Sequence, residues 1–181
     1  MQAETKRLVL RPLAEEDYEV WKAGFENAYP QQYKYDGQKL DLSEWTLEAF
    51  KEVVKEHEEM MSADQAYILA IFRKSDLQHI GMVGIWTLMR GDFQWGYIEY
   101  RLHNPYWKQG YAREAVQKGF TVAFDALGFH RIEAHINVDN DPSIKLAEHV
   151  GMQYECRRNA FTYEEGQWRD SFIYVINAPV S

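Results

Sequence analysis

Three β-rich segments in the middle of the chain constrain the fold more than any other feature. They span Ala66–Phe72, Ile80–Met89 and Gln94–Leu102, and only the short polar stretches RKSDLQH and RGDF separate them. Connections this short reverse the chain, because parallel neighbours need a crossover of a dozen residues or more. The sequence therefore predicts a meander of antiparallel strands at the centre of the molecule.

Helical patterns flank this meander on both sides. Apolar residues at helical spacing predict a helix over 14–27 and a second one after Ser43, which we expect to be its N-cap. Small and apolar residues from Ala112 to Leu127 recur at i, i+3 and i+4, so this helix can lie close to a sheet. Asp141 as N-cap and Gly151 as terminator bracket a short fourth helix.

Further apolar runs complete the sheet. They predict strands at residues 8–10, 131–138, 152–158 and 171–176. The order β, α, α, three strands, α, β, α, two strands predicts an α/β fold with a mixed, mostly antiparallel sheet flanked by helices. No linker or internal repeat divides the 181 residues, so we expect one domain over 1–181.

The charge balance and the side-chain inventory argue against several kinds of site. Lys and Arg total 20 against 28 Asp and Glu, and the net charge of −8 disfavours nucleic acid and fits either plain solubility or a cationic partner. The single Cys156 allows no internal disulfide, and the six histidines form no H-x-x-x-H or H-E-x-x-H pair, so we expect no metal. Without a run of ~18 apolar residues, we expect a cytoplasmic protein with no membrane partner.

The most informative stretch links the meander to the long helix. A strand ends near Leu102, Gly110 lies in a short turn, and the helix begins at once. Unpaired N–H groups of a first helical turn converge on one point, where the helix dipole adds positive charge, so the geometry suits an anion. Lys108 and Arg113 add positive charge, and Ala112 keeps the next position small. A purely structural turn remains an open alternative, because the segment matches no Walker or dinucleotide motif.

A second candidate feature follows the strand 131–138. There the sequence D-N-D-P-S places Asn140 and Ser143 at the start of the short helix. If the two strands are neighbours, both helix N-termini open onto the same edge of the sheet. Asn140 could then bind an amide-bearing ligand and Ser143 could donate a proton; alternatively, both residues only cap the helix.

Several motifs together resemble one family. They are the opening T-K-R-L-V-L-R-P, the strand I-G-M-V-G-I, the turn and helix Y-W-K-Q-G-Y-A-R-E-A, and the segment N-D-P-S followed by G-M. With the order of elements, they resemble the GNAT superfamily of acyl-CoA-dependent N-acetyltransferases, and in particular its RimJ/RimL-like branch, which acetylates N-terminal amines of ribosomal proteins. The family's Q/R-x-x-G-x-G/A turn is matched by Trp107 to Ala112, with Trp107 in place of Gln or Arg and Lys108 in place of a Gly typical of the branch.

The resemblance implies that the strands ending at Leu102 and Val138 splay apart and that acetyl-CoA lies between them. Its pantetheine amides would pair with the backbone of Arg101, Leu102 and His103. Its pyrophosphate would rest on main-chain N–H groups of the turn and the first helical residues, which are Gln109, Gly110, Tyr111, Ala112 and Arg113. We expect Lys108 to take an ordinary φ in this turn, where it does not prevent binding by the main chain.

The resemblance also assigns Asn140 and Ser143. Asn140 matches the ligand-facing Asn of the family, and Ser143 matches a Ser that can protonate the leaving thiolate in this branch. Many relatives use a Tyr on the later helix for that proton. The comparable stretch here, residues 145–149, has none, so Ser143 is our candidate.

Acetyl transfer also needs a base that takes the proton of the attacking amine. Glu99 lies on the strand ending at Leu102 and shares a face with Trp95, Tyr97 and Arg101. This position makes Glu99 the candidate base, with a purely structural salt bridge to Arg101 as the alternative. Glu155 and His135 are reserve candidates for the same role.

The sequence thus predicts an acetyl-CoA-dependent N-acetyltransferase that acts on a primary amine in a ternary complex. The acidic charge and the many aromatic residues suit a cationic acceptor, such as a peptide or protein N-terminus, a polyamine or an aminoglycoside. The alternative is a non-catalytic acyl-CoA sensor acting through a protein partner, which would need neither Ser143 nor Glu99. A nucleotide-binding protein is disfavoured, because no acidic ribose or magnesium ligand follows the turn. Family habit suggests a monomer or a homodimer.

Overall fold

The computed structural model describes residues 1–179, and its strands form one sheet in the order β1-β2-β3-β4-β5-β6-β8-β7. Neighbouring strands are antiparallel except β5 and β6, which are parallel. The strands are β1 (Ala3–Glu4), β2 (Leu8–Arg11), β3 (Ala66–Arg73), β4 (His79–Met89), β5 (Trp95–Leu102), β6 (Arg131–Asn137), β7 (Gln153–Glu164) and β8 (Gln167–Asn177).

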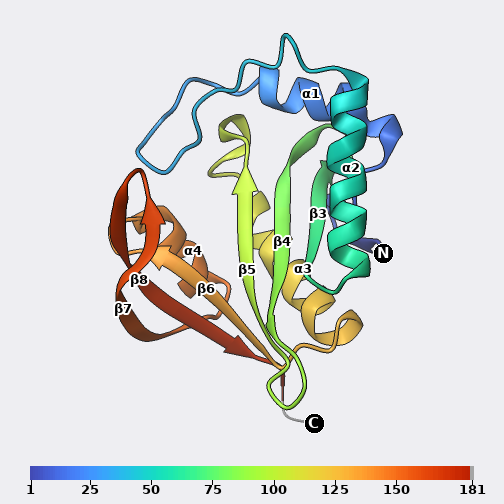
Figure 1. Ribbon diagram of the computed structural model, residues 1–181. Helices are drawn as coiled ribbons and strands as arrows, with labels where there is room; N and C mark the ends of the chain where they lie inside the picture. Colours follow the sequence, from blue (N-terminus) through green and yellow to red (C-terminus); the bar gives the residue numbers. More distant parts are fainter. Residues whose placement is uncertain (180–181) are drawn as a thin grey trace.

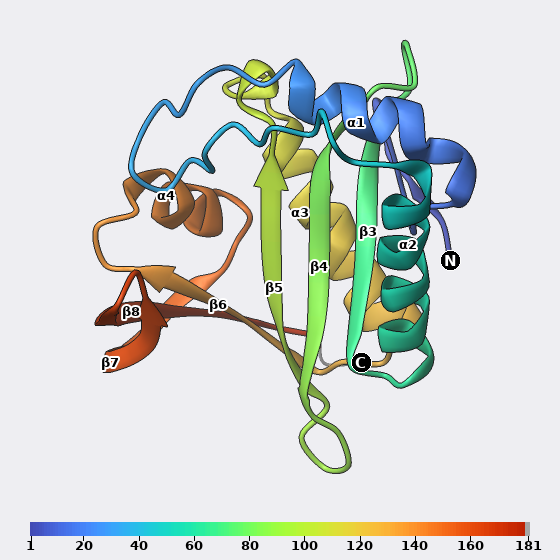
Figure 2. The same ribbon diagram turned by 45° about the horizontal axis from the view of Figure 1, so that its top comes forward.

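Helices cover both faces of the sheet (Figure 1). The α-helices are α1 (Tyr18–Glu26), α2 (Leu47–Ser62), α3 (Tyr111–Thr121) and α4 (Asp141–His149). Short 3-10 turns precede α1 and α3, and a π-helical turn over Val122–Ala126 extends α3. Figure 2 shows α1 and α2 on one side of β3 and β4, with α3 behind them.

The central strands are buried on both faces. Ala70 and Phe72 of β3 pack into the apolar cluster under α1 and α2, whereas Leu69 and Ile71 pack into the larger cluster under α3. Alternate residues of a strand point to opposite faces, so a strand covered on both sides must be apolar throughout. This explains why the run Ala66–Phe72 shows no polar alternation.

The pairing of β5 changes along its length. With β4 it is paired from Trp95, opposite Met89, to Leu102, opposite Gly81. With β6 it is paired only from Trp95 to Tyr97, and beyond Tyr97 the two strands diverge, as both views of the ribbon show. The predicted mixed and splayed sheet with flanking helices is confirmed. Beyond Tyr97 the diverging strands leave a gap, and along it one edge of β5 has no strand partner among residues 1–179.

Several predicted boundaries are wrong. The N-cap of α2 is Thr46, whose hydroxyl accepts the Ala49 N–H at 3.2 Å, while the Ser43 N–H donates to Asp41 in the preceding turn. The N-cap of α4 is Asn140, and Asp141 is its first helical residue.

The last two strands are longer than predicted. They reach Glu164 and Gln167 and form a hairpin that turns at Gly166. Most side chains near this tip are exposed, so the sequence there lacks the apolar alternation by which a strand is recognised. The strand β1 also lacked a signal, because it has only two residues.

Candidate active site

The α3 helix begins without a side-chain cap. Gly110, at the N-cap, has φ +80°, and the first bond of the helix joins the Glu114 N–H to the Gly110 carbonyl at 3.1 Å. The N–H groups of Tyr111, Ala112 and Arg113 precede that bond and point out of the helix end. The turn therefore offers main-chain donors and the positive end of the helix dipole to an anion.

The conformation of Lys108 differs from our expectation. Its φ is +59°, in the left-handed region, rather than an ordinary negative value. This region costs a side chain roughly 1–2 kcal/mol, which is why glycine suits such a position. The turn thus contains two left-handed residues, Lys108 and Gly110, and only one of them is a glycine.

The end of β5 lies next to this turn, but its main chain is partly engaged. The Leu102 carbonyl accepts the indole N–H of Trp107 at 2.9 Å, and the His103 N–H donates to the Ile80 carbonyl at 2.9 Å. Arg101 packs its guanidinium against Gly37, where an added Cβ would lie 1.5 Å from Nη2. The edge of β5 that faces the gap without a strand partner runs from Ile98 towards Arg101.

The His103 side chain is buried beside His79, with His103 Nε2 and His79 Nδ1 3.2 Å apart. Burial and, to a smaller extent, the nearby positive charge of Arg101 lower the pKa of His103 to about 4. Burial and the neighbouring His103 lower the pKa of His79 to about 3. This neutral pair packs against the end of β5 on the face of the sheet that α1 covers.

The α4 helix begins with its own cap. The Asn140 side-chain oxygen accepts the Ser143 N–H at 3.4 Å, and Pro142 has no N–H to offer. Ser143 is half-buried, and its carbonyl accepts the Tyr100 hydroxyl at 3.3 Å. Burial raises the pKa of Tyr100 to about 12, so the phenol stays protonated. Tyr100 of β5 thus reaches across the gap and ties the start of α4 to the strand that leads into α3.

Glu99 lies on the face of β5 opposite to Tyr100 and Ile98. It is exposed, and its carboxylate accepts the indole N–H of Trp86 at 2.9 Å. Within residues 1–179 it forms no ion pair with Arg101, so the salt bridge that we gave as the structural alternative is not formed.

An aromatic row extends from Trp86 across the sheet. The Trp86 ring stacks on Tyr97 with centroids 6.0 Å apart, and Tyr97 stacks on His135 at 5.1 Å. The row crosses β4, β5 and β6 at the point where the gap begins. Of the reserve bases, His135 contacts Glu133 at 2.8 Å and Glu155 is ion-paired with Arg131 at 2.5 Å.

A long connection, residues 27–46, lies over the wide end of the gap (Figure 1). The Asn104 side chain holds it by accepting the Tyr29 N–H at 2.7 Å and donating to Asp36 at 2.9 Å. On the other side, Lys34 is ion-paired with Asp139 at 2.7 Å. The connection therefore bridges the residues that follow β5 and the residues that follow β6.

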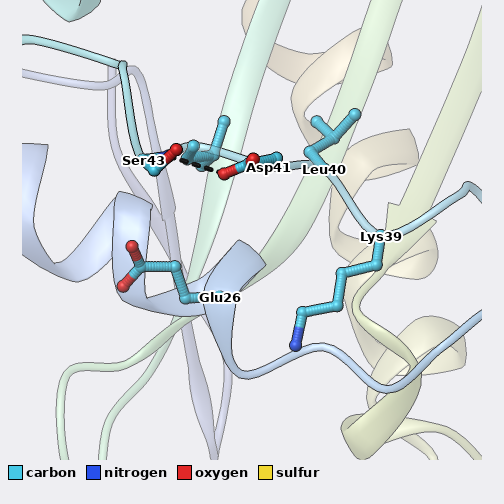
Figure 3. A pocket seen from close by; sticks show the side chains of 6 residues that line it. Glu26, Lys39, Leu40, Asp41 and Ser43 are labelled. Atoms are coloured by element: carbon cyan, nitrogen blue, oxygen red, sulfur yellow. Dashed lines mark hydrogen bonds between the residues drawn. The ribbon is translucent and has the colours of Figure 1, made fainter.

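The surface has two shallow hollows near this connection. One, of about 490 Å³, is lined by Glu26 and residues 39–43 and lies beside α1 (Figure 3). The other, of about 330 Å³, lies between Tyr35, Asp139 and Trp168, at the ends of β6 and the β7–β8 hairpin. Among residues 1–179 no three His, Cys, Asp or Glu side chains are grouped to hold a metal ion, and no helix is long and apolar enough to cross a membrane.

Sequence patterns did not indicate Tyr100 or Asn104. Their partners lie far away in the chain, since Tyr100 contacts Ser143 and Asn104 contacts residues 29–36. The only local signal was that a polar Asn directly follows a strand and precedes a proline. The two local motifs, by contrast, lie where they were predicted, with Gly110 at the start of α3 after β5 and Asn140 at the start of α4 after β6.

Comparisons with known proteins agree with this geometry. The model of the Acetyltransferase (GNAT) domain family matches residues 7–153. The chain is 30% identical over 135 residues, 75% of each chain, to the probable N-acetyltransferase YjcK of Bacillus subtilis (strain 168). It is 24% identical over 114 residues, 63% of this chain and 59% of the relative, to the [ribosomal protein uS5]-alanine N-acetyltransferase of Escherichia coli (strain K12).

A solved structure with a similar fold is Mycobacterium smegmatis RimJ in complex with CoA-disulfide, with a TM-score of 0.77 and 22% identity over 94% of this chain and 82% of that one. The family model covers most of the chain, and in this chain an uncapped helix end follows the strand that diverges from its neighbour. The chain belongs to the GNAT family of N-acetyltransferases, which use acetyl-CoA.

Proposed function

We propose that this chain transfers the acetyl group of acetyl-CoA to a cationic primary amine, by direct attack in a ternary complex. The observation that carries the proposal is the gap between β5 and β6, with the uncapped end of α3 at its mouth. Main-chain N–H groups of Gln109 to Arg113 suit a pyrophosphate, with Lys108 close by. The edge of β5 that is unpaired beyond Tyr97 leads to Arg101, Leu102 and His103 and suits the pantetheine amides, with the Arg101 carbonyl itself turned towards Gly81 of β4.

In this proposal Ser143 is the proton donor. When the amine nitrogen attacks the thioester carbonyl carbon, the carbon–sulfur bond breaks and the sulfur leaves as a thiolate. The Ser143 hydroxyl protonates this thiolate and regains a proton from the nitrogen that has formed the amide, directly or through water. Asn140 caps α4 with its oxygen and keeps its amide N–H₂ for the ligand. The Tyr100 hydroxyl, bound to the Ser143 carbonyl, holds this residue against β5.

Glu99 is the proposed base. An amine acceptor is mostly protonated at neutral pH, because an α-amine titrates near ~8 and a lysine-like amine near ~10.4. Glu99 removes this proton directly or through one water, from an exposed position next to the aromatic row of Trp86, Tyr97 and His135. Rings and a carboxylate on one face suit a cation.

The acceptor class rests on charge and on similarity. The chain carries a net charge of −8, and one relative is named as a [ribosomal protein uS5]-alanine N-acetyltransferase. We propose a peptide or protein N-terminus, or a small cationic amine such as a polyamine or an aminoglycoside. We further propose that the whole chain is a single N-acetyltransferase domain, acting as a monomer or a homodimer.

Free CoA release with a panel of amines tests the function. The panel contains a peptide with N-terminal alanine, spermidine and an aminoglycoside, each compared with a no-amine control. We expect release that depends on one of these classes. Release at the same rate without an amine contradicts the acceptor assignment.

A Glu99→Gln variant tests the base. Gln keeps an oxygen that can accept the Trp86 N–H but cannot take a proton, so we expect a lower rate near pH 7 that partly recovers as rising pH deprotonates the free amine. A pH–rate profile that matches that of the unmodified protein removes Glu99 from the mechanism. A melting curve of the variant detects a purely structural role.

A further inference from the structure

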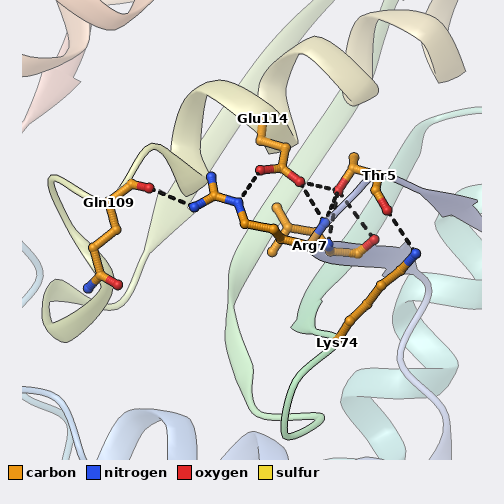
Figure 4. Close-up of polar contacts among 6 residues, drawn as sticks. Thr5, Arg7, Lys74, Gln109 and Glu114 are labelled. Carbon is orange, nitrogen blue, oxygen red and sulfur yellow. Dashed lines mark hydrogen bonds and ion pairs between the residues drawn. The ribbon is translucent and has the colours of Figure 1, made fainter.

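Arg7 lies in the short connection between β1 and β2, yet its side chain ends at the turn before α3. Its Nε is 2.6 Å from Glu114 Oε2, and its Nη1 donates to the Gln109 carbonyl at 2.9 Å. Figure 4 shows the guanidinium between these two acceptors. We propose that Arg7 is a further ligand of the acetyl-CoA pyrophosphate, an assignment that rests on the function proposed above.

The Nη2 atom of the Arg7 guanidinium faces Gly110, where the phosphate would approach. A Cβ added to Gly110 would lie 3.3 Å from Arg7 Nη2 and would meet no other atom within 4 Å. A guanidinium has five N–H donors, and the hydrogen bonds found among residues 1–179 use Nε and Nη1. The two N–H groups of Nη2 are therefore left beside Gly110 for an anion, in the planar arrangement that suits phosphate oxygens.

The guanidinium is held in place before any ligand arrives. Glu114 accepts the main-chain N–H of Arg7 at 2.9 Å with its other oxygen, which also accepts the Thr5 hydroxyl. The guanidinium carbon lies 4.3 Å from the centroid of the Tyr111 ring. Because the side chain is already ordered, binding an anion needs little further loss of its freedom.

Arg7 also balances a negative charge at the helix end. Glu114 lies in the first turn of α3. Without Arg7, its carboxylate would repel a phosphate bound to the main-chain N–H groups of that turn. The ion pair with Arg7 cancels this charge. Loss of Arg7 therefore removes two donors and also exposes a repulsive carboxylate.

Two acetyl donors separate this role from a structural one. Acetyl-CoA contains the pyrophosphate, whereas acetyl-pantetheine carries the same thioester without it. For Arg7→Met we expect the KM for acetyl-CoA to rise roughly 10- to 100-fold, the range for a hydrogen bond between charged groups, with kcat nearly unchanged. The kcat/KM for acetyl-pantetheine should stay within about twofold, because this donor does not reach the turn.

Arg90→Met is the matched control. Arg90 is also ion-paired, to Asp64 at 2.6 Å, and also donates to a main-chain carbonyl, of Leu127 at 3.0 Å, but it follows β4 at the other end of the sheet. Its loss should lower the melting temperature without changing the preference between the two donors. A variant Arg7→Met/Glu114→Gln, which removes the uncovered carboxylate, should regain part of the affinity for acetyl-CoA.

An equal loss of activity with both donors overturns the proposal, because it shows that Arg7 only holds the fold. If Arg7→Met does not fold, Arg7→Lys keeps the charge without the planar arrangement and must show the same selective loss to a smaller degree; an equal loss with both donors overturns the proposal again. Failure of the proposed function is distinguishable, since the unmodified protein would then not transfer acetyl groups from acetyl-CoA at all.

Discussion

The first turns of α3 and α4 differ in what occupies their N–H groups. At α3 the N-cap is Gly110, which has no side chain, so the main-chain donors of the turn stay open. At α4 the Asn140 side chain takes the Ser143 N–H and Pro142 supplies none, so fewer main-chain donors stay open and the side chains of Asn140 and Ser143 remain. Both ends lie at the open end of the gap between β5 and β6 (Figure 2). The comparison indicates two ways of contacting a ligand in the function proposed above, through the backbone at α3 and through side chains at α4.

The variant with the largest expected effect tests the role proposed for side chains at the start of α4. Ser143→Ala keeps the N–H that Asn140 caps and the carbonyl that binds Tyr100, so only the hydroxyl is lost. We expect kcat to fall roughly 10²- to 10⁴-fold, the range of general acid catalysis, with the Kd for CoA nearly unchanged. Steady-state kinetics and calorimetric titration measure the two quantities.

Thr46→Ala is the control for this variant. It removes a hydroxyl that caps α2, far from the gap, and should lower stability by about 1 kcal/mol without affecting turnover. Unchanged turnover in Ser143→Ala would make Ser143 only a residue of the helix end.

The next effect is expected at the start of α3. In Gly110→Asp the carboxylate would lie beside Arg7 Nη2 at the open helix end and repel a phosphate, and we expect CoA affinity to fall about 100-fold, which corresponds to about 2.7 kcal/mol. Titration with CoA measures the loss.

Gly128→Asp controls for the conformation of the substituted residue. Gly128 also has a positive φ, +70°, and an added Cβ meets nothing there, but it lies after the far end of α3. It should bind CoA normally. If Gly110→Asp binds CoA as tightly as Gly128→Asp, the phosphate does not lie on the α3 turn.

The two helix ends also differ in the buried residues that support them, and the pH dependence of stability tests this difference. His79 and His103 are buried and neutral beneath the end of β5 that leads into α3, with pKa values lowered to about 3 and 4. In the unfolded chain both titrate near ~6.5, so this chain keeps its full stability above that pH and loses it as the pH falls towards 4. We expect a loss of about 3 kcal/mol between pH 6.5 and 5, measured by urea unfolding.

The carboxylates respond in a different range. The pKa of Asp64 is lowered to about 2, chiefly by hydrogen bonds from Arg90, so its contribution is present above ~4 and is lost below. A double variant His79→Gln/His103→Gln should therefore flatten the curve only between pH 5 and 6.5. A steep curve in that window without the two histidines contradicts this origin.

The strands and the helix turn of this comparison were predictable from the sequence, because their geometry depends on residues close together in the chain. The meander and α3 are encoded by local periodicity, and the strand, Gly110 and helix are consecutive, so their geometry follows from nearby residues. The Arg7 contact with Glu114 joins residues 107 positions apart, and the connection at 27–46 is held by residues 104 and 139. Neither leaves a local pattern. The φ of Lys108 was mispredicted because its residue type favours the right-handed region, and only the turn around it imposes the other.

A smaller effect separates the two roles of Asn140. Asn140→Ala loses the cap and should cost about 1 kcal/mol of stability. Asn140→Asp keeps an oxygen for the Ser143 N–H but loses the amide donor, so it should fold with nearly full stability and still bind CoA more weakly. Full CoA affinity in the Asp variant would mean that Asn140 serves α4 alone.

The smallest expected effect tests whether the α3 turn binds a phosphate through its main chain alone. Lys108 has φ +59°, and relief of this strain in Lys108→Gly should gain ~1–2 kcal/mol, reduced by the ~0.5–1 kcal/mol that the greater freedom of glycine costs in folding. We therefore expect a net stabilisation of roughly 0.5–1 kcal/mol, and Ala160→Gly, at φ +46° in β7, should behave alike. If the phosphate is bound by main-chain N–H groups, Lys108→Gly leaves CoA affinity within about twofold. A larger loss of affinity would show that the α3 turn also works through a side chain, because the substitution removes the Lys108 side chain with its amine.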